Sequence, residues 1–515
     1  MIMTSALNQM ILDSKPLNSS KAWELMTNPG VDVGLSSETV EKIRNSRQRV
    51  EKVLNSGETV YGINTGFGAL AEVRISDEDL LTLQGNLIRS HCVGVGRDFP
   101  DQIVRGILLL RAHTLSLGFS GVRVEVVEQI LSLLNHNILP RIPRIGSLGA
   151  SGDLAPLAHM SLALLGEGEV RKDGELIQAS KALGDLGLAP LVLEAKEGLA
   201  LINGTPVMCA IGVECIERAR ILIKSADIIA AMCLEALSGT DQAFLPRLHE
   251  LRPHHGQRLS ARNLYNLLQD SAHRESHRDC GRVQDAYSLR CIPQVHGTCY
   301  DAFFRTLETL EIEINSVTDN PIVLEDAIIS CGHFHGEPVS MVLCYLAMGL
   351  SELASLSERR QNRLMNHHLS HLPPFLIENS GLNSGLMIAH YTSAACVSEN
   401  KGLAYPAVVD SIPTSADQED HVSMGVTSAK NCLRIIENLE SVLSIELLMA
   451  AQGLEYASKP VSASLQNVFE ELREIVEPVD RDRVFKGDIE NARNFLRSGR
   501  PVKLVESSLG NLMKE

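Results

Sequence analysis

Long runs of helix-type periodicity dominate the second half of this 515-residue chain and limit the folds available to it. Apolar residues recur three and four positions apart in these runs, which predicts helices that each bury one side. The predicted long helices cover 206–238, 293–317, 337–366, 384–403 and 420–455, and two shorter ones follow at 463–476 and 487–498. Long helices bury their apolar sides most readily against one another. We therefore expect a predominantly all-α fold built around a bundle of long helices.

The first part of the chain has shorter predicted helices, separated by glycine-rich loops. These helices cover 37–54, 76–91, 100–117, 122–135 and 154–165. Strand signals are few, at 59–61 and at 169–172, where Asp173-Gly174 predicts a hairpin turn. Near 205–220 the sequence changes from short predicted helices and glycine-rich loops to long predicted helices. We therefore expect an N-terminal domain over residues 1–215 and a long-helix bundle domain over 216–515.

The charge balance disfavours one broad class of function. Lys and Arg total 47 against 63 Asp and Glu, which gives a formal net charge of −16. A general nucleic-acid binder needs a basic face to displace counterions from phosphates, so we do not expect this activity. The longest uncharged run, 379–398, is too polar for a membrane span. The first 20 residues lack a secretory pattern and the 11 cysteines include no C-x-x-C, so we expect a cytoplasmic protein with reduced thiols.

The segment from Gly146 to His159, GSLGASGDLAPLAH, is the most informative part of the sequence for chemistry. Its glycines and serines are too concentrated for a simple connector before a helix capped by Asp153. It does not match the phosphate-binding GxxxxGK[ST] pattern, nor the G-x-S-x-G turn of a nucleophilic serine. A different chemistry is therefore required to explain it.

Backbone cyclisation is a third possibility. The amide nitrogen of Gly152 can attack the carbonyl carbon of Ala150 and close a five-membered ring. Loss of water from that carbon and elimination of the Ser151 hydroxyl would leave a methylene conjugated to an imidazolone. Glycine leaves the nitrogen unobstructed and tolerates a strained backbone, while serine supplies the leaving group. Asp153 is placed to carry a proton and to cap the following helix.

This segment resembles the signature of the aromatic amino acid ammonia-lyases, which build a 4-methylidene-imidazole-5-one (MIO) electrophile from Ala-Ser-Gly. The resemblance spans nearly the whole chain and is closest to the branch of the family that acts on histidine. The further matching motifs are YGINTGFG at 61–68, LINGT at 201–205, RVQDAYSLRCIPQVHG at 282–297, TDNP at 318–321, FHGEP at 334–338 and QEDHVSMG at 418–425.

The resemblance implies a role for each matched position. Tyr61 would remove the β-proton of the substrate, and Asn203 would hold the amide geometry beside the MIO. Tyr287 would position the amine, and Arg290 would bind the substrate carboxylate through its planar fork. The catalytic positions are then Tyr61, Ala150, Ser151, Gly152, Asn203, Tyr287 and Glu419, and the substrate-binding positions are His91, Gln284, Arg290 and Phe334.

The pair that faces the substrate ring indicates the substrate within the family. Phenylalanine lyases resemble Phe-Leu at this place and tyrosine lyases resemble His-Leu, whereas this chain has Ser90-His91. Glu419 favours an imidazole, because a carboxylate facing a bare phenyl ring lacks a hydrogen-bond donor. We therefore expect a carbon–nitrogen lyase that converts L-histidine into trans-urocanate and ammonia. Two alternatives remain: a tyrosine ammonia-lyase or MIO-dependent 2,3-aminomutase, and a non-catalytic helical assembly protein.

The resemblance also implies a fold and an assembly. The fold is that of the ammonia-lyases and fumarases, with a glycine-rich N-terminal domain that carries the MIO. The assembly is a homotetramer whose active sites combine residues of three chains. No external cofactor is expected, nor is a metal at the histidine pairs His273/His277 and His367/His371, because H-E-x-x-H is absent. Two positions depart from the family pattern: His333 and Asp417, where Asn is usual.

Overall fold

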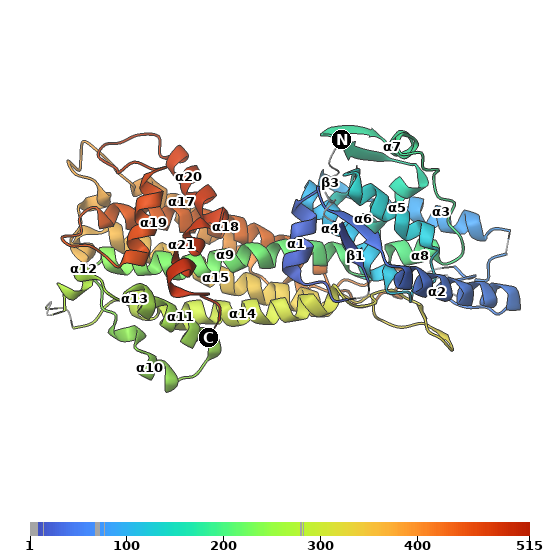
Figure 1. Cartoon of the computed structure of the whole chain (residues 1–515), viewed down its shortest axis with the longest axis horizontal. Helices are drawn as coiled ribbons and strands as arrows, with labels where there is room; N and C mark the ends of the chain where they lie inside the picture. The colour runs from blue at the N-terminus through green and yellow to red at the C-terminus, as the bar shows by residue number, and fades with distance from the viewer. Residues whose placement is uncertain are drawn as a thin grey trace, which may run out of the picture. The chain divides into compact units, whose positions relative to one another are not determined.

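Helices make up most of the chain, as the periodicity predicts (Figure 1). The computed structural model describes residues 9–13, 15–66, 73–76, 78–278, 281 and 283–514. Phe67 and Gly68 of the predicted tyrosine loop and Arg282 of the 282–297 motif lie outside the described residues. The all-α expectation is confirmed.

The chain folds into two compact units, each assembled from three separate stretches. The first unit comprises the residues up to Glu214 together with Leu307–Leu343 and Pro406–Lys430, and the remainder forms the second. Four long helices each supply residues to both units: α9 (Pro206–Ala236), α14 (Ile292–Glu313), α15 (Glu337–Met365) and α18 (Gly425–Leu454). The chain first passes from the first unit to the second between residues 214 and 215, close to the domain boundary expected from the sequence. It returns to the first unit twice, at Leu307–Leu343 and Pro406–Lys430, which the sequence did not predict.

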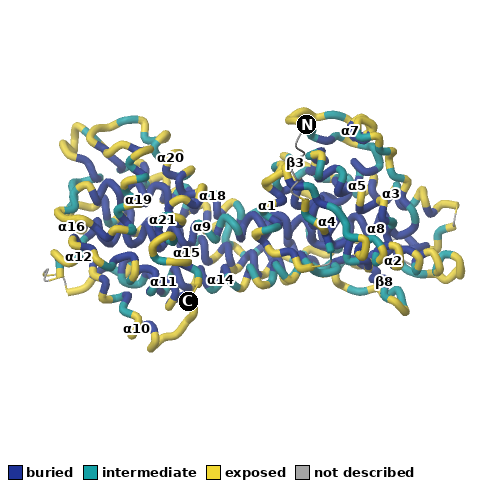
Figure 2. The backbone as a smooth tube through the Cα atoms, in the orientation of Figure 1, coloured by how far each residue is buried: buried dark blue, intermediate teal, exposed yellow. Residues whose placement is uncertain are grey.

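The first unit packs short helices around α4, which is buried along nearly its whole length (Figure 2). Its helix α4 contacts both α1 and α5. The helices are α1 (Ser19–Thr27), α2 (Ser37–Ser56), α3 (Leu80–His91), α4 (Asp101–Ser116), α5 (Val124–Asn135), α6 (Leu154–Leu162), α7 (Ala179–Asp185) and α8 (Glu197–Ile202). Helix α2 illustrates why these segments begin and end where they do. Ser36 accepts a hydrogen bond from the Thr39 amide, and Gly57 ends the helix at φ 72°.

Short strands complete the first unit. Strand β1 (Gln9–Leu12) pairs in parallel with β2 (Asp32–Leu35), whereas the other pairs are antiparallel. These are β3 (Val95–Asp98) with β5 (Pro143–Ile145), β6 (Glu169–Lys172) with both β4 (Leu139–Pro140) and β7 (Glu175–Gln178), and β8 (Ile322–Val323) with β9 (Ile328–Ile329). The predicted hairpin is confirmed, since β6 and β7 join through Asp173 and Gly174, both at positive φ.

The second unit is built from helices and connecting loops, without a β-strand among its described residues. Besides its parts of the long helices it contains α10 (Pro246–Glu250), α11 (His255–Leu267), α12 (Ala272–Glu275), α13 (Tyr287–Arg290), α16 (His367–Ser370), α17 (Met387–Leu403), α19 (Ala463–Arg473), α20 (Lys486–Arg497) and α21 (Arg500–Leu509). In the part of the chain that the structure describes, α15 alone is long and apolar enough to cross a membrane, and 61% of its apolar window is buried. Such burial is typical of a core helix.

Some local predictions were wrong, and several helices, among them α1 and α11, were not predicted. No strand forms at 59–61, because the Asn64 side chain closes a turn there by bonding the Val60 amide and the Glu58 carbonyl. The helix expected from residue 420 begins at Gly425, after a segment in which Ser415, Ala416 and Asp417 adopt positive φ. Helix α21 was missed, although Gly499 followed by Pro501 is a helix stop and a helix start in succession.

Candidate active site

The Ala150-Ser151-Gly152 tripeptide lies in a tight loop that other segments hold in place. Gly152 has φ 76°, and a Cβ there would collide with the carbonyl of Gly204. The Asp153 amide donates to that carbonyl at 2.7 Å, and the Gly204 amide donates to the Ser151 carbonyl at 3.2 Å. Glycine at 152 is therefore required both by its conformation and by the close approach of a second backbone. The loop is thus held by backbone bonds to Gly204 on both sides of Gly152.

Asp153 caps a different helix from the one the sequence predicts. It stands at the N-cap position of α6, but its side chain makes no capping bond there. Its Oδ2 instead accepts the Val207 and Met208 amides at 2.8 and 3.0 Å, in the first turn of α9. Burial raises the pKa of Asp153 to about 7, although these amides and the Ser147 hydroxyl act against the shift. The side chain thus ties the loop to the start of α9.

We expect Asp153 to make stability depend on pH. Its pKa in the folded protein lies above the ordinary value of 3.8, so the folded chain retains a proton that the unfolded chain releases. This contribution is complete below about pH 4 and is lost as the pH rises towards 7. Asp153→Asn, whose side chain does not titrate, should flatten the fall in Tm between pH 4 and pH 8. Asp173→Asn, an exposed carboxylate in a turn, serves as the control and should keep the wild-type slope. An unchanged slope in Asp153→Asn would contradict the assignment.

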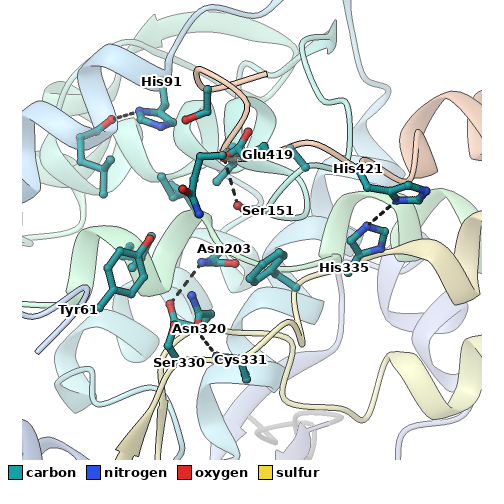
Figure 3. Close-up of a pocket in the computed structure, with 18 of the residues that line it drawn as sticks. Tyr61, His91, Ser151, Asn203, Asn320, Ser330, Cys331, His335, Glu419 and His421 are labelled. Atoms are coloured by element: carbon teal, nitrogen blue, oxygen red, sulfur yellow. Dashed lines mark hydrogen bonds between the residues drawn. The ribbon is translucent and has the colours of Figure 1, made fainter. Parts of the chain in front are cut away.

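A cavity of about 720 Å³ in the first unit opens beside this loop (Figure 3). It is lined by residues from six separate parts of the sequence, which the fold brings together. Seven of the predicted site residues line it: Tyr61, His91, Ala150, Ser151, Asn203, Phe334 and Glu419. Gly152 is adjacent to Ser151 in the same loop. The exposed His333 and Asp417, the two departures from the family pattern, are not among the lining residues.

Glu419 faces the tripeptide across the cavity. Its Oε1 accepts from the Ser151 hydroxyl at 3.5 Å, and its Oε2 accepts from the Thr414 hydroxyl at 3.1 Å. The backbone of Glu419 pairs with Thr414 in an isolated bridge, and Glu419 lies six positions before α18 begins. The side chain therefore does not cap α18, which was the main structural alternative to a role in the site.

His91 ends α3 at the same cavity. Its Nδ1 lies 2.8 Å from the Leu87 carbonyl, so the neutral ring donates from Nδ1 and leaves Nε2 as an acceptor. Burial lowers the pKa of His91, while the Leu87 carbonyl and Glu419 act in the opposite direction. A neutral imidazole at the end of α3 can accept a hydrogen bond from a ligand N–H.

The backbone of Asn203 is held by Arg111, a residue that the sequence did not suggest. The Asn203 Nδ2 donates to the Asn320 carbonyl at 3.3 Å, whereas its buried Oδ1 has no partner among the described residues. Arg111, fully buried in α4, donates to the Asn203 backbone carbonyl. Burial lowers the pKa of Arg111 to about 10. The one available signal was a charged residue within the apolar run ILLLRAHTL.

Other lining residues fall in motifs that were noted without assigning them a role. Asn320 belongs to TDNP, His335 to FHGEP and His421 to QEDHVSMG. Ser330 and Cys331 follow β9 and were not anticipated, because the contribution of a short hairpin to a cavity depends on its packing.

The remaining predicted site residues, Gln284, Tyr287 and Arg290, belong to the second unit. The Tyr287 ring is exposed over 71% of its surface, and the Arg290 guanidinium lies over it at 4.6 Å from the centroid. The Nε atom of Arg290 is buried without a partner among the described residues. An exposed aromatic ring with a stacked guanidinium is a surface suited to a planar anionic ligand.

Known proteins resemble this chain in both sequence and fold. The family model described as aromatic amino acid lyase matches residues 17–474. The chain belongs to the aromatic amino acid lyase family. It is therefore a carbon–nitrogen lyase that acts on an amino acid.

Individual lyases of this family resemble the chain along nearly its whole length. The histidine ammonia-lyase of Gloeobacter violaceus is 50% identical over 487 residues, which cover 94% of this chain and 95% of that protein. The histidine ammonia-lyase of Natranaerobius thermophilus is 47% identical, with 96% and 98% covered. The crystal structure of the Trypanosoma cruzi histidine ammonia-lyase superposes with a TM-score of 0.90 at 42% identity, covering 97% and 95% of the two chains. A tyrosine aminomutase from Streptomyces globisporus superposes with a TM-score of 0.91 at 35% identity, covering 97% and 98%.

Proposed function

We propose that this protein is a histidine ammonia-lyase, which deaminates L-histidine to trans-urocanate and ammonia in the first step of histidine degradation. The observation that carries the proposal is the cavity in which the Glu419 carboxylate and the neutral His91 ring stand beside the Ala150-Ser151-Gly152 loop. Both groups accept hydrogen bonds, which suits an imidazole N–H and would be unsatisfied against a phenyl ring. The histidine ammonia-lyases among its relatives support the same substrate. The free state of the ten described cysteines supports a reducing, cytoplasmic location.

The residues present fit an MIO at positions 150–152. Gly152 and Gly204 approach too closely for a side chain, and the unpartnered Oδ1 of Asn203 lines the same cavity. Once formed, the MIO supplies an electrophile that makes the amino group a better leaving group or acidifies the β-carbon. The start of α6 and the start of α9 meet at Asp153, so the positive ends of two helix dipoles lie beside the loop.

The side chains that line the cavity perform the remaining steps, which are proton removal and positioning of the substrate. Tyr61 removes the β-proton, and His91 and Glu419 orient the imidazole. Phe334 packs against the substrate ring. Asn203 holds the amide geometry beside the loop, and Arg111 fixes the backbone of Asn203 from behind. Each role rests on a residue that borders or supports the cavity.

The substrate carboxylate needs a positive partner that this cavity lacks. Of the described residues that line it, none is Arg or Lys. We propose that Arg290, with Tyr287 and Gln284, comes from another copy of the chain in a homotetramer with shared sites. The exposed Tyr287 supports this, and so does the Arg290 guanidinium that stacks on its ring, because a ligand can reach this surface.

The experiment that tests the function is incubation of the purified protein with histidine, tyrosine and phenylalanine in separate reactions. Urocanate, followed by its ultraviolet absorbance, is the expected product. Formation of a hydroxycinnamate would indicate a tyrosine ammonia-lyase, and formation of a β-amino acid would indicate an aminomutase. Absence of any product from a protein whose mass shows a mature MIO would overturn the proposal.

Arg290→Lys should raise KM for histidine more than it lowers kcat. Lysine keeps the charge but loses the bidentate fork and the stacking on Tyr287. Loss of one charge-assisted hydrogen bond, about 1.5–3 kcal/mol, corresponds to a rise in KM of roughly tenfold to a hundredfold. Arg278→Lys, an exposed arginine paired with Glu275, is the matched control. An unchanged KM in Arg290→Lys would contradict its role in binding the carboxylate.

A further inference from the structure

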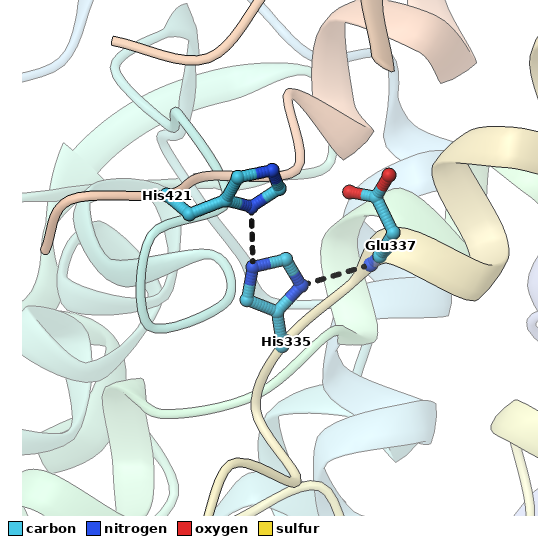
Figure 4. Close-up of side chains that lie close together, drawn as sticks. All are labelled: His335, Glu337 and His421. Atoms are coloured by element: carbon cyan, nitrogen blue, oxygen red, sulfur yellow. Dashed lines mark hydrogen bonds between the residues drawn. The ribbon is translucent and has the colours of Figure 1, made fainter. Parts of the chain in front are cut away.

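A cluster of three metal-ligating side chains lies at the edge of the cavity: His335, Glu337 and His421 (Figure 4). Their ligand atoms all lie within 4.8 Å of one another, and among the described residues no other such group of three occurs. His335 and Glu337 precede and begin α15, while His421 lies in the segment before α18. The proposed deamination assigns no role to any of the three.

The spacing of the two histidines suits a shared cation better than a hydrogen bond. His421 Nδ1 lies 3.4 Å from His335 Nε2, at the long end of the hydrogen-bond range. Zinc–nitrogen bonds of about 2.0–2.1 Å in a tetrahedral site place neighbouring nitrogen ligands about 3.4 Å apart. The two ring nitrogens are therefore already spaced as neighbouring ligands of one ion.

The carboxylate supplies the third ligand. Oε2 of Glu337 is buried and has no hydrogen-bond partner among the described residues. A buried carboxylate oxygen without a donor is costly, and a cation would satisfy it. In Figure 4 the carboxylate stands on the same side of the His335 ring as His421.

We propose that His335, Glu337 and His421 bind one divalent transition-metal ion of the zinc class. Two imidazoles and one carboxylate favour Zn²⁺ or Co²⁺ over Mg²⁺ and Ca²⁺, which prefer oxygen ligands. Three protein ligands leave a fourth position for water. His421 is exposed, so the ion can enter from solvent. The bound ion would join the segment that carries Phe334 to the segment that carries Glu419, and so would stiffen one wall of the cavity.

The first test is titration of the chelator-treated full-length protein with ZnCl₂ by calorimetry, in the absence of substrate. The wild type should bind one Zn²⁺ per chain more than His421→Gln or His335→Gln. Glu337→Gln should bind at least about tenfold more weakly, because loss of even an outer partner of a metal site costs 10–100-fold. His333→Asn, which removes an exposed histidine two positions from His335, should bind like the wild type and controls for surface imidazoles.

The second test uses Co²⁺ and thermal unfolding. Visible bands of tetrahedral Co²⁺ should form in the wild type and in His333→Asn but not in His421→Gln. Zinc should raise Tm in the same two proteins only, because a ligand that binds the folded state stabilises it. Equal zinc stoichiometry and equal Tm shifts in the wild type and His421→Gln would overturn the proposal, and so would no binding by the wild type. Because binding is measured without turnover, either result stands apart from whether the protein deaminates histidine.

Discussion

Ser151→Ala is expected to fold normally and to lose essentially all histidine deamination. Alanine has no hydroxyl to eliminate, so the methylene of the MIO cannot form. The fold should be kept, because among the described residues the Ser151 hydroxyl bonds only Glu419, at 3.5 Å. The loop itself is held by the backbone bonds to Gly204, which alanine preserves. We expect kcat for histidine to fall by at least about a thousandfold, the scale of a lost electrophilic or charge-stabilising group.

Intact mass separates this prediction from a general loss of structure. The mature wild type should be lighter than its encoded sequence by two water molecules, whereas Ser151→Ala should keep its full encoded mass. Circular dichroism and Tm should match those of the wild type. Ser161→Ala, a buried serine in the following helix whose hydroxyl bonds the Leu157 carbonyl, is the control and should retain the mass loss. Deamination by an unmodified Ser151→Ala protein would refute the MIO proposal.

Glu419→Gln is expected to lower kcat/KM for histidine by at least tenfold to a hundredfold. Glutamine keeps the shape and one acceptor oxygen but removes the charge. A hydrogen bond to a charged group is worth about 1.5–3 kcal/mol, which sets this minimum. The loss is larger if Glu419 also moves a proton to or from the imidazole. His91→Asn should have a smaller effect, because His91 orients the ring as a neutral group.

The alternative for Glu419 is a purely structural role through Thr414. On that account Glu419→Gln would lower Tm and leave kcat/KM for histidine nearly unchanged, since its Oε2 bonds the Thr414 hydroxyl. Thr414→Val is the matched variant, because it removes the same hydrogen bond without touching the carboxylate. We expect Thr414→Val to lower Tm and to leave kcat/KM for histidine nearly unchanged. Glu419→Gln should lower kcat/KM for histidine and leave Tm nearly unchanged. The opposite pattern would reopen the tyrosine-lyase and aminomutase alternatives.

The sequence by itself determined the helical class and the long helices, and it suggested the chemistry that we propose for the Ala150-Ser151-Gly152 tripeptide. Helical periodicity is local, so α9, α14 and α15 begin and end close to where it predicts. Cyclisation involves three consecutive residues, so their identity suffices to suggest it. The motif resemblance also named seven residues that line one cavity, because each motif keeps its residue types together in the chain. Their individual roles remain predictions.

Only the tertiary structure decided which distant segments meet. Asp153 was expected to cap α6, but its side chain caps α9. The backbone bond between Asp153 and Gly204 brings the first turn of α9 within reach of the carboxylate. Arg111 supports Asn203 from 92 positions away, and nothing in a local pattern encodes that distance. His335 and His421 are 86 positions apart and become neighbours only when their segments pack in the first unit. Local sequence determines conformation through short-range sterics and hydrogen bonds, whereas such pairings depend on burial of the whole core.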